Sequence, residues 1–143
     1  MISVKKMLEW KPSNLFLSIT PEYMVIEALE YMAEKNIGAV MVMDGDRLAG
    51  IFSERDYARK GIIKGRKAQS TPVTEVMTHN VFTVTPEMSS DDCMKMFIEK
   101  GIRHLPVMNE GKVIGMVSIR DIVNAIIEEQ KTHIEFLEQY ISG

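Results

Sequence analysis

The chain has 143 residues, of which 45% are hydrophobic, and a formal net charge of −3 at pH 7. This apolar share is typical of a globular protein with a buried core, and the slight negative charge gives no reason to expect nucleic acid or an anionic membrane as the main partner. A single cysteine, Cys93, excludes an internal disulfide, and the three scattered histidines predict no metal site.

The N-terminal segment MISVKKMLEW has neither a long apolar run nor a small-residue cleavage site, and no stretch of the chain is apolar enough to span a bilayer. We therefore expect a soluble, cytoplasmic protein without a membrane partner. The run LFLSITP is apolar, partly β-branched and stopped by a proline, which predicts a short strand and a turn. The next segment carries Ile26, Leu29, Met32 and Ala33 at helical spacing.

Two further strands and a helix complete this first unit. The runs GAVMVM and RLAGIFS flank Asp44-Gly45, a strong signal for a β-hairpin, and a helix is expected to begin near Glu54. The stretch that follows contains Lys64, Arg66 and Lys67 among glycines and a proline. It predicts a linker with a solvated basic face, and a phosphate or nucleic-acid patch is the alternative.

The sequence then repeats itself at a distance of sixty-five residues. GIFSERD at residues 50–56 returns as GMVSIRD at residues 115–121, and twelve positions between residues 20 and 56 are identical to their counterparts. Chance would give only about two such matches at average residue usage. The chain is therefore an internal duplication.

The second copy follows the plan of the first. VFTVTP predicts a strand, Ser89 with Asp92 three residues later predicts a capped helix, and a helix is expected to begin near Ile119 after a hairpin at Asn109-Glu110-Gly111. Each copy thus reads strand, helix, strand, strand, helix. We expect one domain over residues 1–64, a linker over 65–74, a second domain over 75–128 and a helical extension over 129–143.

The last helix carries an apolar seam beyond the repeat. Ile127, Ile134, Leu137 and Ile141 stand seven, three and four residues apart, which is typical of a helix that meets another helix. Self-association into a homodimer is the first interpretation. The alternative is that this helix packs back on its own domain.

These motifs resemble a family. EYMAEKNIGAVMVMDGDRLAGIFSERD in the first copy, and KGIRHLPVMNEGKVIGMVSIRD in the second, are similar to a tandem pair of cystathionine-β-synthase (CBS) domains, also called a Bateman module, of the small stand-alone type. The resemblance covers nearly all of residues 4–127. It implies a mixed α/β (α+β) fold of two β-α-β-β-α units, each a small sheet packed on two helices, related by a pseudo-twofold axis. It also implies that the clefts between the units hold adenosine compounds and that two modules pair into a dimer.

The repeated Ser-x-x-Asp has a structural and a functional interpretation. Serine at a helix N-cap with a carboxylate three residues later forms a capping box, worth about 1 kcal/mol. In the functional interpretation each carboxylate accepts the ribose hydroxyls, while the serine and the helix amides meet phosphate. Arg55 and Arg120 lie in first helical turns, where the macrodipole disfavours a cation by about 0.3–1 kcal/mol. A bound phosphate would explain that placement better than a solvated arginine.

The second copy is the better-equipped one, because Arg103 and His104 stand where the first copy has Gly38 and Ala39. His104 has an alternative reading as a satisfied histidine at the start of a strand. Phe52 and Tyr57 are expected to pack and not to stack on a base. With the resemblance, the candidate ribose ligands are Asp121 and Asp56, and the candidate phosphate ligands are Ser118, Arg120, Arg103, His104, Ser53 and Arg55. The candidate adenine contacts are Thr83, Val84, Thr85, Pro86, Leu105, Pro106, Ser18, Ile19, Thr20 and Ala39.

No catalytic arrangement is evident in the sequence. It contains no Walker-type loop, nucleophile elbow or metal-ligand spacing, and Cys93 falls inside a predicted amphipathic helix. We expect a non-catalytic regulatory module that needs no cofactor and binds AMP, ADP, ATP or NAD(H) to sense energy or redox state for an unidentified partner protein. The alternatives are an interaction module without a ligand and a sensor of S-adenosylmethionine.

Overall fold

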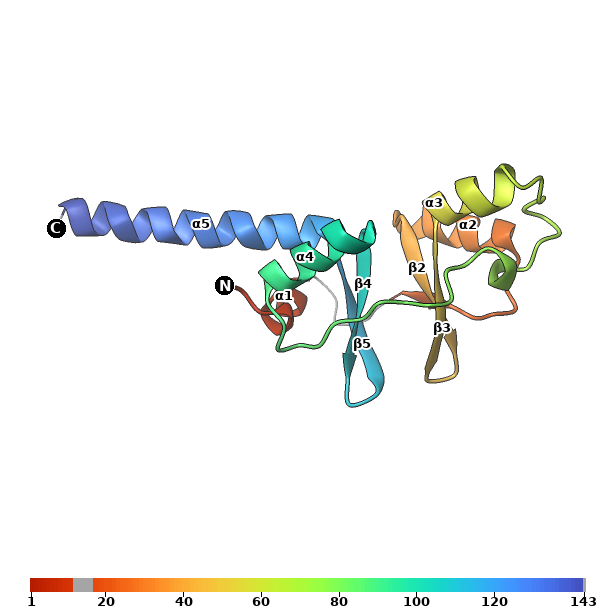
Figure 1. Ribbon diagram of the computed structural model, residues 1–143, viewed down its shortest axis with the longest axis horizontal. Helices are drawn as coiled ribbons and strands as arrows, with labels where there is room; N and C mark the ends of the chain where they lie inside the picture. The colour runs from red at the N-terminus through yellow and green to blue at the C-terminus, as the bar shows by residue number, and fades with distance from the viewer. Residues whose placement is uncertain (12–16, 143) are drawn as a thin grey trace. The chain divides into compact units, whose positions relative to one another are not determined.

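The computed structural model describes residues 1–11 and 17–142, which form two compact units (Figure 1). The first unit comprises residues 17–82. The second comprises the described residues from Thr83 onwards together with the N-terminal residues 1–11. The N-terminal segment thus packs with the second repeat, so the packing units divide the chain differently from the predicted domains, which followed the repeat along the sequence.

The first unit is a three-stranded sheet with helices, in the strand order β1-β2-β3. β1 pairs with β2 in parallel and β2 with β3 in antiparallel register. The strands are β1 (Ser18–Ile19), β2 (Ala39–Asp44) and β3 (Arg47–Ser53). The helices are α2 (Val25–Lys35), α3 (Glu54–Asp56), a π-helical turn (Tyr57–Ile62) and a 3-10 turn (Val73–Glu75).

The core of the first unit lies between α2 and the sheet. Met32 of α2 and Val40 and Phe52 of the strands are buried there, and Tyr57 packs against them. The prediction that Phe52 and Tyr57 pack is confirmed. The predicted first strand is short, because only Ser18–Ile19 pairs with β2, and the beginning of the LFLSITP run lies outside the described residues.

The second unit is built on a two-stranded antiparallel hairpin. The predicted strand at VFTVTP is reduced to one parallel bridge, Val84 to Val107, because Pro86 follows and has no N–H for a ladder. The elements are α1 (Val4–Glu9), α4 (Ser90–Lys100), β4 (His104–Asn109), β5 (Lys112–Ser118) and α5 (Ile119–Ser142).

Local signals in the sequence are confirmed where they depend on near neighbours. Both predicted hairpins form, and Gly45 and Gly111 take positive φ of 61° and 79° at their turns. Ser89 caps α4, accepting from the Asp92 N–H at 3.2 Å while its own N–H donates to that carboxylate at 2.9 Å. Helices begin at Glu54 and at Ile119 as expected.

The repeated glycine of each β-hairpin lies under the segment that precedes the other repeat. Leu8, which precedes the first repeat, packs on Gly115 of the second, whereas Met77, which precedes the second, packs on Gly50 of the first. Side chains at these glycines would occupy the space that Leu8 and Met77 fill. This exchange of segments explains why both copies keep a glycine there.

Gly50→Ala is expected to destabilise the protein by about 1–3 kcal/mol, and more than Gly115→Ala does. A Cβ at Gly50 would lie 2.7 Å from the carbonyl oxygen of Thr78, which is fixed because it accepts the Ile51 N–H at 3.0 Å. A Cβ at Gly115 would meet only the flexible end of Leu8, at 2.9 Å. Urea unfolding of both variants tests this difference, and equal losses would contradict it.

The helix α5 has 24 residues and extends beyond α4 and the β4–β5 hairpin (Figure 1). Only Ile122 and Ala125 of this helix are buried. The four seam residues are 44–82% exposed, so the alternative that they pack back on their own unit is wrong. No described helix, α5 included, has an apolar stretch that could cross a bilayer. The exposed seam residues are Ile127, Ile134, Leu137 and Ile141.

Candidate functional site

The Ser-x-x-Asp motif of the second unit forms the turn from β5 into α5. The Ser118 N–H donates to Oδ2 of Asp121 at 2.8 Å, and the Asp121 N–H donates to the Ser118 hydroxyl at 3.2 Å. The same reciprocal pair forms in the first unit between Ser53 and Asp56, at 3.0 and 3.1 Å. The capping interpretation is therefore confirmed in both copies. A ribose hydroxyl could then bond only to the carboxylate lone pairs that the caps do not use.

A lysine that the sequence analysis missed completes the turn of the second unit. The Lys11 ammonium donates to Oδ2 of Asp121 at 3.0 Å and to the carbonyl oxygen of Met116 at 2.7 Å. Lys11 is 110 residues away from Asp121 in the sequence. No spacing rule connects them, because the contact depends on α1 packing against β5 and α5.

His104 and Arg103 adjoin this turn. His104 is the cross-strand partner of Ser118, and the carbonyl oxygen of Arg103 accepts the Ile119 N–H at 2.9 Å. Burial lowers the pKa of His104, and the charges of Lys11 and Arg103 lower it further while Asp121 opposes them. His104 is therefore neutral at pH 7, with one ring nitrogen that donates and one that accepts.

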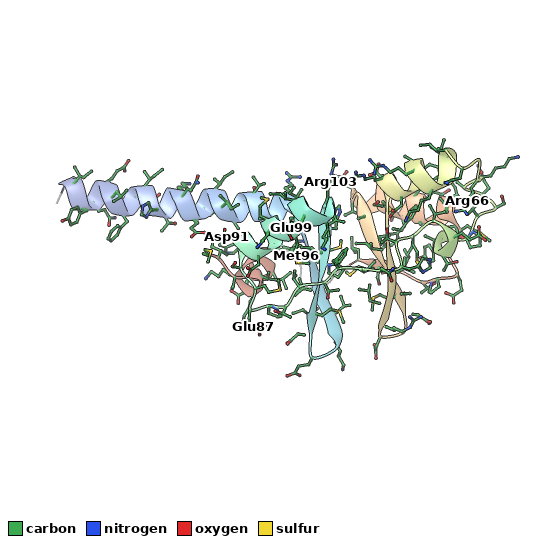
Figure 2. The ribbon with its side chains drawn as sticks, in the orientation of Figure 1. Arg66, Glu87, Asp91, Met96, Glu99 and Arg103 are labelled. Atoms are coloured by element: carbon green, nitrogen blue, oxygen red, sulfur yellow. The ribbon has the colours of Figure 1, made fainter. Side chains whose placement is uncertain are left out.

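The described structure thus brings most of the predicted phosphate ligands of the second unit to one place. The side chain of Arg103 is exposed at the beginning of β4, as Figure 2 shows, and Arg120 is exposed in the first turn of α5. Of these three cations, Lys11 contacts the carboxylate of Asp121, Arg103 adjoins the turn through its backbone, and Arg120 precedes Asp121 in the sequence. We call this set the second-unit cluster: Lys11, Arg103, His104, Ser118, Arg120 and Asp121.

The first unit satisfies its aspartate more completely. Oδ1 of Asp56 accepts the Thr78 hydroxyl at 3.1 Å and lies 3.4 Å from the Lys60 ammonium, while Oδ2 is bonded by Ser53. In the second unit both the cap and the lysine fall on Oδ2. Within residues 1–11 and 17–142, the hydrogen bonds that the Asp121 carboxylate accepts fall on Oδ2.

The first unit also has fewer polar side chains beside its turn than the second unit has. Gly38 stands where the second unit has Arg103, and its carbonyl oxygen accepts the Glu54 N–H at 3.1 Å, as the Arg103 carbonyl does for Ile119. Ala39 is buried at the position of His104. Arg55 is exposed in the first helical turn, like its counterpart in α5.

The predicted adenine contacts divide by burial. Ile19, Val84 and Leu105 are at most 2% exposed and belong to the cores of their own units, so their side chains cannot meet a ligand while the cores are closed. The Val84 N–H and C=O are both bonded to β4, at 3.0 and 2.8 Å. Ala39, Pro86 and Pro106 are also buried, Ser18 is half-buried, and Thr20, Thr83 and Thr85 are exposed.

Cys93 has the environment of a core residue and not of a nucleophile. It is buried in α4, and burial raises the pKa of its thiol to about 11, with Asp92 adding to the shift. The thiol is protonated at neutral pH, whereas nucleophilic cysteines need the thiolate. Among the described residues no cluster of His, Cys, Asp and Glu could hold a metal ion.

Comparison with known proteins identifies the family. The model of the CBS domain matches residues 13–62 and again residues 73–128. The chain belongs to the CBS domain family. Its two matches correspond to the two repeats, and several of the matched relatives are named for their CBS domains.

The CBS relatives include proteins of similar size with known structures. The chain is 39% identical over 133 residues to the mitochondrial CBS domain-containing protein CBSX3 of Arabidopsis thaliana, covering 90% of this chain and 65% of that protein. A CBS-domain protein of Burkholderia ambifaria has 44% identity and a TM-score of 0.86, over 90% of this chain and 96% of that one. CBSX2, solved in complex with AMP, shares the fold at 23% identity and a TM-score of 0.74, over 90% and 98% of the two chains.

Proposed function

We propose that this CBS pair is a non-catalytic regulatory module that binds an adenosine nucleotide of the AMP, ADP, ATP or NAD(H) type. The nucleotide binds at the second-unit cluster, and its occupancy reports energy or redox state to a partner protein. The observation that carries the proposal is the turn at Asp121, where Lys11 and the Ser118 N–H both bond Oδ2 and where Arg103, His104 and Arg120 adjoin the turn. The AMP complex of CBSX2 supports the ligand class.

The chemistry of the cluster matches the two polar ends of a nucleotide. Oδ1 of Asp121 accepts a ribose hydroxyl, since a carboxylate takes hydrogen bonds from vicinal hydroxyls. The helix macrodipole disfavours a cation at Arg120, in the first turn of α5, and a phosphate bound beside the N-terminus of α5 offsets this unfavourable interaction. Arg103 adds a bidentate donor, and neutral His104 adds one N–H.

The first-unit turn is the weaker site in this proposal. Asp56 retains the same cap, but its second oxygen already accepts from Thr78 and lies beside Lys60. A ribose hydroxyl would have to displace these contacts. Ser53 and Arg55 remain proposed phosphate ligands there, with lower affinity.

Nucleotide binding is expected to raise the thermal stability of the protein. A ligand present at one hundred times its dissociation constant adds about 2.7 kcal/mol to the free energy of unfolding. Thermal melts with AMP, ADP, ATP, NADH and S-adenosylmethionine, each up to millimolar concentration, measure the shift, and native mass spectrometry of freshly purified protein identifies any retained ligand. No shift with any compound would favour an interaction module without a ligand, and a shift with S-adenosylmethionine alone would favour that sensor.

The proposal includes a homodimer formed through α5. The seam residues Ile127, Ile134, Leu137 and Ile141 are exposed on a helix that extends beyond its own unit. A second copy of α5 offers an identical apolar face, and pairing the two removes both from water.

A further inference from the structure

The backbone of Lys11 is held in place by the packing of the N-terminal segment against the second unit. Lys11 follows the C-terminal end of α1, and its N–H donates to the Leu8 carbonyl at 3.3 Å. Leu8 in turn packs on Gly115, and the Val4 N–H donates to the Met88 carbonyl at 2.8 Å. The segment before the first repeat therefore places an ammonium group at the turn between Ser118 and Asp121 in the second repeat.

This lysine increases the difference in net charge between the two turns. The second-unit cluster contains three cations, Lys11, Arg103 and Arg120, and one carboxylate, that of Asp121, which Lys11 contacts. The first-unit turn is balanced. Its two cations, Arg55 and Lys60, are accompanied by two carboxylates, Glu54 and Asp56.

We propose that Lys11 is a specificity-determining residue that makes the second-unit cluster select anionic adenosine nucleotides over uncharged or cationic adenosine compounds. This inference rests on the proposed function and deepens it. The ammonium contacts Oδ2 of Asp121, and Oδ1 is the oxygen that we propose for ribose. The long, flexible side chain brings the same charge to a phosphate bound beside the α5 N-terminus.

Because Lys11 and Asp121 are partly buried, their charges can affect the binding of charged ligands more than that of uncharged ones. The side chains of Lys11 and Asp121 are 36% and 21% exposed, so their charges are screened less than those of a fully solvated pair. A third cation close to the phosphate dianion strengthens the binding of AMP. It does not strengthen the binding of adenosine, which carries no charge. S-adenosylmethionine carries a sulfonium cation that the cluster repels.

Lys11→Met is expected to weaken AMP binding about tenfold and to leave adenosine binding within about twofold, because only AMP carries the phosphate. Isothermal titration calorimetry of both ligands at fixed ionic strength measures the ratio. Lys6→Met is the matched control, since it removes the same charge from an exposed position on α1 and is expected to leave both affinities unchanged. S-adenosylmethionine is expected to bind the wild-type protein more weakly than AMP does.

Each result decides a different question. Equal weakening of AMP and adenosine, or no change in either, overturns the role of Lys11 while the proposed function stands. A wild-type protein that binds none of AMP, ADP, ATP and NAD(H) overturns the proposed function itself. If Lys11→Met does not fold, Lys11→Arg keeps the charge and is expected to keep the preference for AMP. The wild-type affinity for AMP should also fall with added salt more steeply than that for adenosine, and equal salt dependence would overturn the inference.

Discussion

Asp121→Ala is expected to abolish the tighter nucleotide-binding event, whereas Asp56→Ala is expected to leave that event within roughly tenfold of its wild-type affinity. A hydrogen bond to a charged group contributes about 1.5–3 kcal/mol, and the two ribose hydroxyls each make one. The difference between the variants follows from the available oxygen. We propose that Oδ1 of Asp121 meets the ligand, since the bonds from the described residues fall on Oδ2, whereas both oxygens of Asp56 are already bonded within the first unit.

The cap must be separated from the ligand contact, since Asp121→Ala also removes a capping box. Asp92→Ala provides the control, because it removes the same box from α4 and lies outside the second-unit cluster. It should lower stability by about 1 kcal/mol without changing nucleotide affinity. If Asp92→Ala weakens binding as much as Asp121→Ala does, the aspartate acts through folding and not through ribose.

Arg120 distinguishes the phosphate end of the nucleotide from its ribose end. Calorimetric titration of Arg120→Ala should show AMP weakened far more than adenosine, and equal weakening would exclude a phosphate contact. Asp121→Ala should instead weaken both ligands, because both carry ribose. The two variants together therefore assign each end of the nucleotide to one side chain.

The sequence predicts the parts of this site that depend on residues close along the chain. The duplication aligns Ser53 with Ser118, and the structure forms the same cap after β3 and after β5. Hairpins and helix starts also follow from a few neighbouring residues. These features are local, and local geometry is what turn and capping patterns encode.

The features that the sequence did not predict depend on distant packing. Lys11 and Thr78 reach the two aspartates only because the segment before each repeat packs against the other repeat, and this exchange leaves no pattern in the sequence. The sequence also did not indicate which of the predicted adenine contacts are buried. Val84 and Leu105 read as strand residues near a ligand, but neither periodicity nor the resemblance indicates that their side chains close the core.

The full chain is expected to sediment as a homodimer at micromolar concentration, and lysine at the seam should dissociate it. Ile134 and Leu137 are 54% and 44% exposed in the single chain. Burying one such side chain contributes about 1.5–3 kcal/mol, and each substitution removes two per dimer. Ile134→Lys with Leu137→Lys should therefore weaken association more than a hundredfold, whereas Glu135→Lys, on the neighbouring face of α5, should leave the dimer intact.

The charges beside the seam predict how the two helices run. Lys131 and Glu138 are seven residues apart on the same flank of α5, so an antiparallel pair places each Lys131 beside Glu138 of the partner subunit. Lys131→Glu should then weaken the dimer, and adding Glu138→Lys should restore it. A double variant no stronger than the single one would indicate parallel helices. A dimer that survives truncation after Gln130 would show that the seam is not the interface, because the contact must then come from the units themselves.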